Sequence, residues 1–173
     1  HNPSNGYDAD YHLKNIQIYP FDIPTPEESK EFFSAPLPYF FPSLVNKICL
    51  ARGGERCIYI AGRSALYINF LLSIFISILF WKISEKIDPE NINLKWLLFT
   101  NLGILTVYYK TFSQVRGEPY IAFFVVLLIY YILKILENLK NDKVLCMNSI
   151  VLGLILGCSI LSRQWAFFII PAL

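Results

Sequence analysis

Charged residues are scarce in this chain of 173 residues. Asp, Glu, Lys and Arg together make up 16% of the sequence, whereas soluble domains carry roughly 25%. Hydrophobic residues make up 55%, and the mean hydropathy is +0.45. The formal net charge of +2 is too small to indicate a nucleic-acid partner. The composition therefore argues against a soluble domain and predicts a protein surrounded by membrane lipids.

Paired cysteine motifs are also lacking. The four cysteines form no CxxC pair, which argues against a zinc site or a thioredoxin-like motif. Cys146 and Cys158 lie in an apolar segment and are expected to act as small hydrophobic residues. Cys49 and Cys57 lie in a more polar part, where they could form a disulfide if that part is outside the cytosol. The chain has no Asn-x-Ser/Thr sequon with an allowed middle residue.

Residues 1–62 contain no uncharged apolar run of 18 residues, so we do not expect them to cross a membrane. They are rich in aromatic residues and hold most of the ten prolines. Short helices are predicted at 9–19, 27–34 and 43–51. We therefore predict an outer or lumenal region with juxtamembrane helices at 1–62. The chain starts with His and ends within an apolar run, so we expect a fragment of a longer protein.

Residues 63–173 carry long apolar runs. The 18 residues at 64–81 and the 19 at 144–162 lack charge, and at about 1.5 Å per residue each nearly crosses a hydrocarbon core of about 30 Å. Two shorter runs, 96–109 and 119–133, need flanking residues to span. A further run begins at 165. The sequence therefore predicts an all-α, multi-pass membrane protein with about four to five transmembrane helices.

Lysines indicate the orientation. Six of them lie in the predicted loops 82–95 and 134–143, at positions 82, 86, 95, 134, 140 and 143. The opposite side holds three cationic residues: Lys110, Arg116 and Arg163. Cytoplasmic loops are enriched in Lys and Arg, so we expect 1–62 and 110–118 to face outward or into a lumen together. Arg52, Arg56 and Arg63, near the first span, favour the reverse orientation.

The stretch "GYDADYHLKN", residues 6–15, places Asp8, Asp10 and His12 at alternate positions. On an extended backbone the three side chains share one side and could hold a divalent cation. In a helix, Asp8 and His12 are neighbours and Asp10 turns away. Asp8 would then suit the N-cap of the helix, or its carboxylate could accept a proton from an attacking hydroxyl. We take these three residues as candidate catalytic residues, with metal binding left open.

The segment "YYKTFSQVRGEPY", 108–120, gathers Lys110, Arg116 and Glu118 in a short loop. Pro119 suits the first turn of the next helix, and Glu118 suits its positive end. Arg116 could bind a phosphate with Glu118 orienting it, although such a loop could also be only a connection. The prolines and aromatic residues of "SAPLPYFFPSL", 34–44, predict a rigid segment on the bilayer interface or a simple turn before the membrane.

Arg163 interrupts the apolar stretch "LSRQWAFF", 161–168. A charge at the centre of a bilayer costs at least about 2.5 kcal/mol, so such residues are usually functional or reach the interface. Counting about 28 Å from Val144 along a helix places Arg163 at the outer interface, on the same side as Asp8 and Arg116. Gln164 follows it directly.

The order of these features resembles the polyprenyl-phosphate-sugar-dependent glycosyltransferases of the GT-C fold, over residues 6–173. An acidic motif precedes the "PLPY" segment, an outer "RGEP" loop and a helix that ends in "LSRQW". The nearest groups are the protein mannosyltransferase-like and aminoarabinose-transferase-like enzymes of family 39. "DADYH" and "SRQ" are also similar to the dolichyl-phosphate-glucose-dependent glucosyltransferase of N-glycan assembly.

The resemblance implies hexosyl or pentosyl transfer from a lipid-linked sugar donor at the outer or lumenal face of the plasma membrane or endoplasmic reticulum. It implies Asp8 as the catalytic base and a neighbouring role for His12, whereas Asp10 departs from the common Asp-Glu pairing. The residues near the lipid phosphate would be Lys110, Arg116, Glu118, Arg163 and Gln164. Metal is not required throughout this family, so a divalent cation at Asp8, Asp10 and His12 stays open as the one possible cofactor. The fragment alone is expected to be inactive.

Two other classes compete with this hypothesis. A transporter or channel subunit would line a pathway with polar residues at mid-depth, whereas the charges here gather at one membrane face. A non-catalytic membrane scaffold would use residues 1–62 as a binding module. An inverted repeat in a longer sequence would favour the transporter, and about 8 to 14 spans would favour the transferase.

Overall fold

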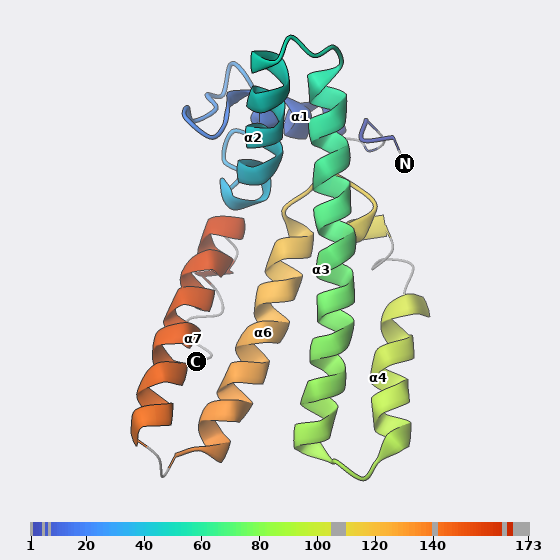
Figure 1. The fold of residues 1–173 in the computed structure, drawn as a ribbon, viewed down its shortest axis with the longest axis vertical. Helices are drawn as coiled ribbons and strands as arrows, with labels where there is room; N and C mark the ends of the chain where they lie inside the picture. Colours follow the sequence, from blue (N-terminus) through green and yellow to red (C-terminus); the bar gives the residue numbers. More distant parts are fainter. Residues whose placement is uncertain are drawn as a thin grey trace.

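The computed structural model of the protein describes residues 2–4, 6, 8–104, 110–139, 142–163 and 166–167 (Figure 1). Within these residues the regular structure is helical, which confirms the all-α prediction. The helices are α1 (Ala9–Ile18), α2 (Leu37–Ala51), α3 (Cys57–Ile87), α4 (Ile92–Ile104), α6 (Glu118–Glu137) and α7 (Asp142–Ser162).

Three of these helices, α3, α6 and α7, are long and apolar enough to cross a membrane. The described part of the chain thus supports three spans, fewer than the four to five predicted. The difference arises at the predicted spans 96–109 and 165–173. Helix α4 has 13 residues, and residues 105–109 and 168–173 lie outside the described part.

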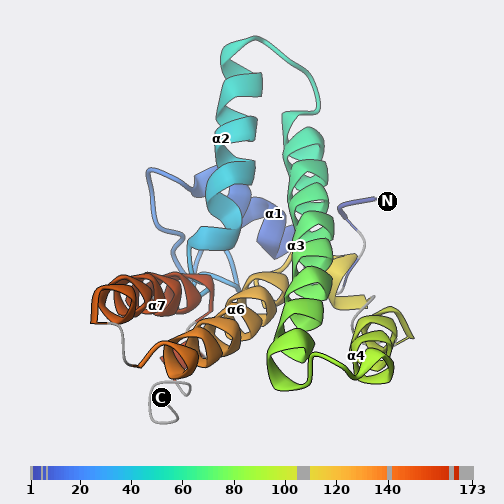
Figure 2. The same ribbon diagram turned by 60° about the horizontal axis from the view of Figure 1, so that its bottom comes forward.

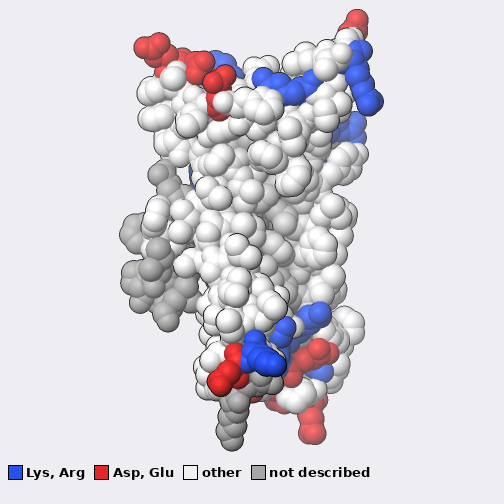
Figure 3. Space-filling model, turned by 60° about the vertical axis from the view of Figure 1, so that its left-hand side comes forward, with Lys and Arg blue, Asp and Glu red and all other residues white. Residues whose placement is uncertain are grey.

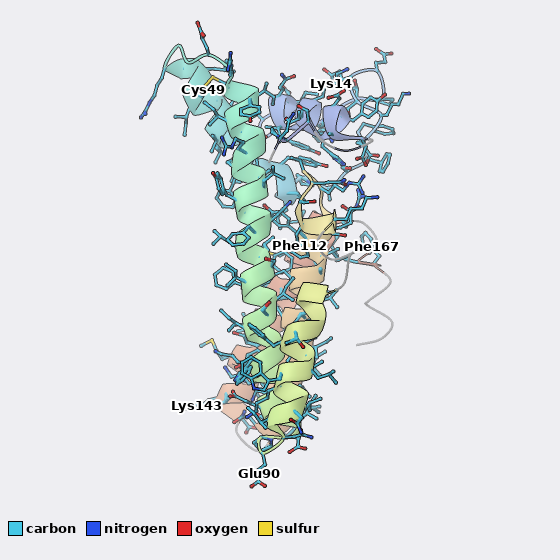
Figure 4. All side chains as sticks on the ribbon, turned by 90° about the vertical axis from the view of Figure 1, so that its right-hand side faces the viewer. Lys14, Cys49, Glu90, Phe112, Lys143 and Phe167 are labelled. Atoms are coloured by element: carbon cyan, nitrogen blue, oxygen red, sulfur yellow. A yellow bond between two sulfur atoms is a disulfide. The ribbon has the colours of Figure 1, made fainter. Side chains whose placement is uncertain are left out.

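The helices separate two polar ends. Helix α6 packs between α3 and α7, and α4 packs against α3 (Figure 2). Lys14 and Cys49 lie at one end of the molecule, and Glu90 and Lys143 lie at the other (Figure 4). On the face drawn in Figure 3, charged residues gather at these ends and uncharged residues fill the space between them. This distribution suits a bilayer around the middle of α3, α6 and α7.

Helix α3 carries helices α1 and α2 at one of its ends. Its 31 residues make it about 46 Å long, which exceeds the roughly 30 Å of a hydrocarbon core. Helices α1 and α2 pack on the turns of α3 that extend beyond this length (Figure 1). One buried cluster joins these elements to the loop before α6, and it contains Ile16, Tyr19, Tyr39, Ala61, Ala65 and Val115.

The N-terminal helices differ in part from the predictions. Helix α1 lies where 9–19 was predicted, and α2 covers 43–51 but begins six residues earlier, at Leu37. Pro38 is tolerated in the first helical turn because its missing N–H would have no partner there, whereas Pro42 lies inside the helix and removes one backbone hydrogen bond. The predicted helix at 27–34 is wrong. Turns replace it, and Asn15 of α1 donates its side-chain N–H to the carbonyl of Glu31.

Cys49 and Cys57 form a disulfide that joins the end of α2 to the start of α3, eight residues on. Replacing both with serine is expected to lower the free energy of unfolding by about 2–3 kcal/mol, because the bond restricts a short loop in the unfolded chain. Thermal unfolding in detergent micelles would measure the loss. In the denatured wild-type protein, alkylation should modify Cys146 and Cys158 at once but Cys49 and Cys57 only after reduction. Immediate alkylation of all four thiols would contradict the bond.

Candidate functional site

Asp8 lies at the N-cap position of α1, but its side chain makes no capping hydrogen bond. Instead, Arg116 donates to Asp8 Oδ1 over 2.7 Å. The other oxygen, Oδ2, lies 3.4 Å from Nε2 of His12, one helical turn along α1. The carboxylate therefore does not cap the helix. It is held by Arg116, which is 108 residues away in the sequence, and it faces His12 on its own helix.

Asp10 does not share this site. Because the backbone is helical rather than extended, Asp10 points to solvent and lines a surface hollow with Lys14 and Gln17. Asp8, Asp10 and His12 thus form no common face. Among the described residues, no group of three or more His, Cys, Asp or Glu side chains could hold a metal ion.

The loop before α6 positions Arg116. Asn69 of α3 donates to the carbonyl of Gln114 over 2.7 Å, and Val115 is buried in the cluster beneath α1 and α2. Gly117 packs so tightly that a methyl group there would lie 2.9 Å from the carbonyl oxygen of Ser162. This fit of the loop against the end of α7 fixes both Arg116 and the residue that follows Gly117.

That following residue, Glu118, opens α6 as predicted, with Pro119 in the first turn. Arg163, directly after α7, donates to Glu118 Oε1 over 2.5 Å and to Ser34 Oγ over 3.3 Å. Its guanidinium also lies 4.0 Å from Glu31, which accepts a hydrogen bond from Ser34. Arg163 therefore ties the segment before α2 to the ends of α6 and α7.

The structure brings most of the predicted site residues into two groups and leaves Asp10 and Lys110 apart. Asp8, His12 and Arg116 form one group, and Glu118 and Arg163 form a second group, joined to the first through the loop that carries both Arg116 and Glu118. Lys110 is exposed, and within the described part of the chain no ion pair joins it to either group. Gln164 lies outside the described residues.

Sequence reasoning missed the partners of these residues. Glu31 and Ser34 were not identified as partners of Arg163, because residues 27–34 were predicted to form a short helix and not part of the site. Tyr39 was treated only as an aromatic residue of the bilayer interface, yet its hydroxyl lies 2.6 Å from Nδ1 of His12. One signal was available, since residues 12, 15, 16 and 19 follow the helical spacing of a buried face. A polar His12 and Asn15 on such a face need partners.

Asp8 and His12 both have pKa values below those of the free side chains. Burial acts to raise the pKa of Asp8, but the Arg116 hydrogen bond and the nearby positive charge outweigh it and lower the pKa. Burial lowers the pKa of His12, and the charges of Asp8, Glu31 and Glu118 offset this only in part. Near neutral pH, Asp8 is therefore a carboxylate and His12 is a neutral imidazole.

Acid should destabilise the protein through His12. Its pKa is lower in the folded state than in the unfolded chain, where it is about 6.5, so the unfolded state binds a proton more readily. The stability due to neutral His12 is complete above about pH 6.5 and is lost as the pH falls toward the folded-state pKa. The stability due to the Asp8 carboxylate is complete above about pH 4 and is lost only as the pH falls below that value, so Asp8 adds no pH dependence between pH 7.5 and 5.

The measurement is the unfolding temperature between pH 7.5 and 5, for the wild type and for His12→Gln. The wild type should lose stability more steeply than the variant over this range. Parallel curves would show that His12 is not the group responsible.

Comparison with known proteins adds no relative to this picture. No protein-family model, curated protein or solved structure matches the chain.

Proposed function

We propose that the chain is part of a membrane glycosyltransferase that moves a sugar from a polyprenyl or dolichyl phosphate to an acceptor hydroxyl. One observation carries the proposal. An ionised carboxylate, Asp8, and two arginines, Arg116 and Arg163, gather at one end of the membrane-spanning helices. A lipid-linked sugar presents its phosphate and its anomeric carbon at that depth, where the hydrocarbon core gives way to polar groups.

Asp8 would act as the general base. The acceptor hydroxyl loses its proton to Asp8 Oδ2, and its oxygen forms a bond to the anomeric carbon. The bond from that carbon to the phosphate oxygen breaks, and its electron pair leaves with the lipid phosphate. This direct displacement inverts the anomeric centre. The lowered pKa of Asp8 ensures that the carboxylate is unprotonated at neutral pH.

The arginines would stabilise the leaving phosphate. Each guanidinium offers five N–H donors, so an arginine that pairs with a carboxylate can still donate to a phosphate. The side chain of Arg116 is 28% exposed and that of Arg163 is 16% exposed, so both are partly open to a ligand. Hydrogen bonds aimed at a developing phosphate charge count among the larger contributions to catalysis.

Two features support an outer or lumenal location for this end of the molecule. The disulfide between Cys49 and Cys57 suits an oxidising compartment. The lysine-rich connections lie at the opposite end, as Glu90 and Lys143 illustrate in Figure 4.

The test uses the full-length protein in lipid vesicles. It is given polyprenyl phosphates that carry different hexoses or pentoses, together with acceptors, and transfer of radiolabelled sugar is measured. Transfer from at least one donor, with inversion, supports the proposal. Solute uptake without sugar transfer would instead indicate a transporter, and the absence of both would favour a scaffold.

A further inference from the structure

Tyr39, His12 and Asp8 form a buried chain of polar groups. His12 is fully buried, and Tyr39 is 1% exposed. The Tyr39 hydroxyl lies 2.6 Å from Nδ1 of His12, and the opposite ring nitrogen, Nε2, faces Asp8 Oδ2. The Tyr39 ring stacks on both the His12 ring and the Tyr19 ring, so Tyr39 is held on each side.

The surroundings select one tautomer of His12. A carboxylate oxygen 3.4 Å from Nε2 favours a proton on that nitrogen, because a bare nitrogen lone pair would face negative charge. Nδ1 is then an acceptor, and the Tyr39 O–H that donates to it favours the same tautomer, because this hydrogen bond needs the Nδ1 lone pair. Burial raises the pKa of Tyr39 and keeps this donor proton in place. His12 Nε2 makes no full hydrogen bond to the described protein atoms, and Asp8 Oδ2, at 3.4 Å, is its ion-pair neighbour.

The two oxygens of Asp8 therefore have different surroundings. Arg116 holds Oδ1 with a short hydrogen bond, whereas the N–H of His12 approaches Oδ2 at 3.4 Å, which is too long and too bent for a full hydrogen bond. The Arg116 hydrogen bond holds the carboxylate through Oδ1, the His12 N–H attracts Oδ2 electrostatically, and Oδ2 keeps lone pairs free for an incoming proton. His12 itself is buried and is not positioned to meet a substrate.

We propose that Tyr39 is a positioning residue that acts through His12, fixing the imidazole tautomer so that Asp8 Oδ2 is oriented toward the acceptor hydroxyl. The inference rests on the proposed function of Asp8 as the base. The tautomer of His12 can nevertheless be measured whether or not sugar transfer occurs. Its loss in a variant would report on Tyr39 directly.

The test compares Tyr39→Phe with Tyr19→Phe in the full-length protein. Both changes remove one buried hydroxyl from the same aromatic stack, but the Tyr19 hydroxyl donates to the carbonyl of Ser34 rather than to His12. The ¹⁵N shifts of labelled histidine in lipid nanodiscs, assigned with His12→Gln, report the tautomer. Steady-state transfer kinetics report kcat and KM separately.

We expect Tyr39→Phe to shift His12 from the Nε2–H form to a mixture of tautomers and to lower kcat by about 10- to 100-fold with KM unchanged. Tyr19→Phe should change neither. An unchanged His12 spectrum in Tyr39→Phe would overturn the proposal, and so would equal losses of kcat in the two variants. If the wild type transfers no sugar, the proposed function fails on that result, and the His12 spectrum still decides whether Tyr39 sets the tautomer.

Discussion

Replacing Asp8 with asparagine is expected to reduce the kcat of sugar transfer by about 10²- to 10⁴-fold, the contribution of a well-placed general base. The amide has the size of the carboxylate, and its oxygen can still accept the hydrogen bond from Arg116 that the structure places at Oδ1. It cannot accept the proton of the acceptor hydroxyl. The loss should therefore appear in kcat, with little change in the KM of the lipid-linked donor.

The matched control is Asp10→Asn, which makes the same chemical change two residues along the same helix. Asp10 is exposed and lies on another face of α1. This variant should transfer sugar at close to the wild-type rate. Near-normal transfer by Asp8→Asn would exclude Asp8 as the base, and equal losses in both variants would indicate damage to α1 rather than to a catalytic group.

The sequence predicted which residues share one end of the molecule. Apolar runs of known length fix which loops lie on the same side, so Asp8, Arg116, Glu118 and Arg163 could be grouped without any structure. For the helical one of the two alternatives left open at residues 8–12, the i,i+4 spacing also predicted that Asp8 and His12 are neighbours while Asp10 turns away. Both inferences rest on local geometry and on the thickness of a bilayer.

The pairing between these residues could not be predicted in the same way. Arg116 and Asp8 are 108 residues apart, and Arg163 and Ser34 are 129 apart. Which arginine meets which carboxylate depends on how the loop before α6 packs against α3 and α7. The helix predicted at 27–34 was wrong because contacts with α1, such as the hydrogen bond from Asn15 to the carbonyl of Glu31, favour turns there. Such contacts between distant residues leave no pattern in the local sequence.

The second large effect is expected at Arg163. If the proposed function holds, Arg163→Gln should raise the apparent KM for the lipid-linked donor about tenfold or more, because it would remove a charge-assisted hydrogen bond to the phosphate. A structural reason could give a similar loss, since the change also leaves Glu118 and Glu31 without their cation. The charge-matched control is Arg63→Gln, an exposed arginine on α3 that should leave donor binding unchanged.

Glu118→Gln separates the two explanations. It weakens the ion pair with Arg163 but leaves the guanidinium in place and more available to an anion. If Arg163 binds the donor phosphate, Glu118→Gln should retain or lower the KM for the donor while Arg163→Gln raises it. If Arg163 serves only to join α6, α7 and the segment before α2, removing either partner breaks the same contact, and both variants should lose stability and donor binding in parallel. A raised KM in Arg163→Gln together with an unchanged or lowered KM in Glu118→Gln, at similar unfolding temperatures, would therefore assign Arg163 to the phosphate rather than to the fold.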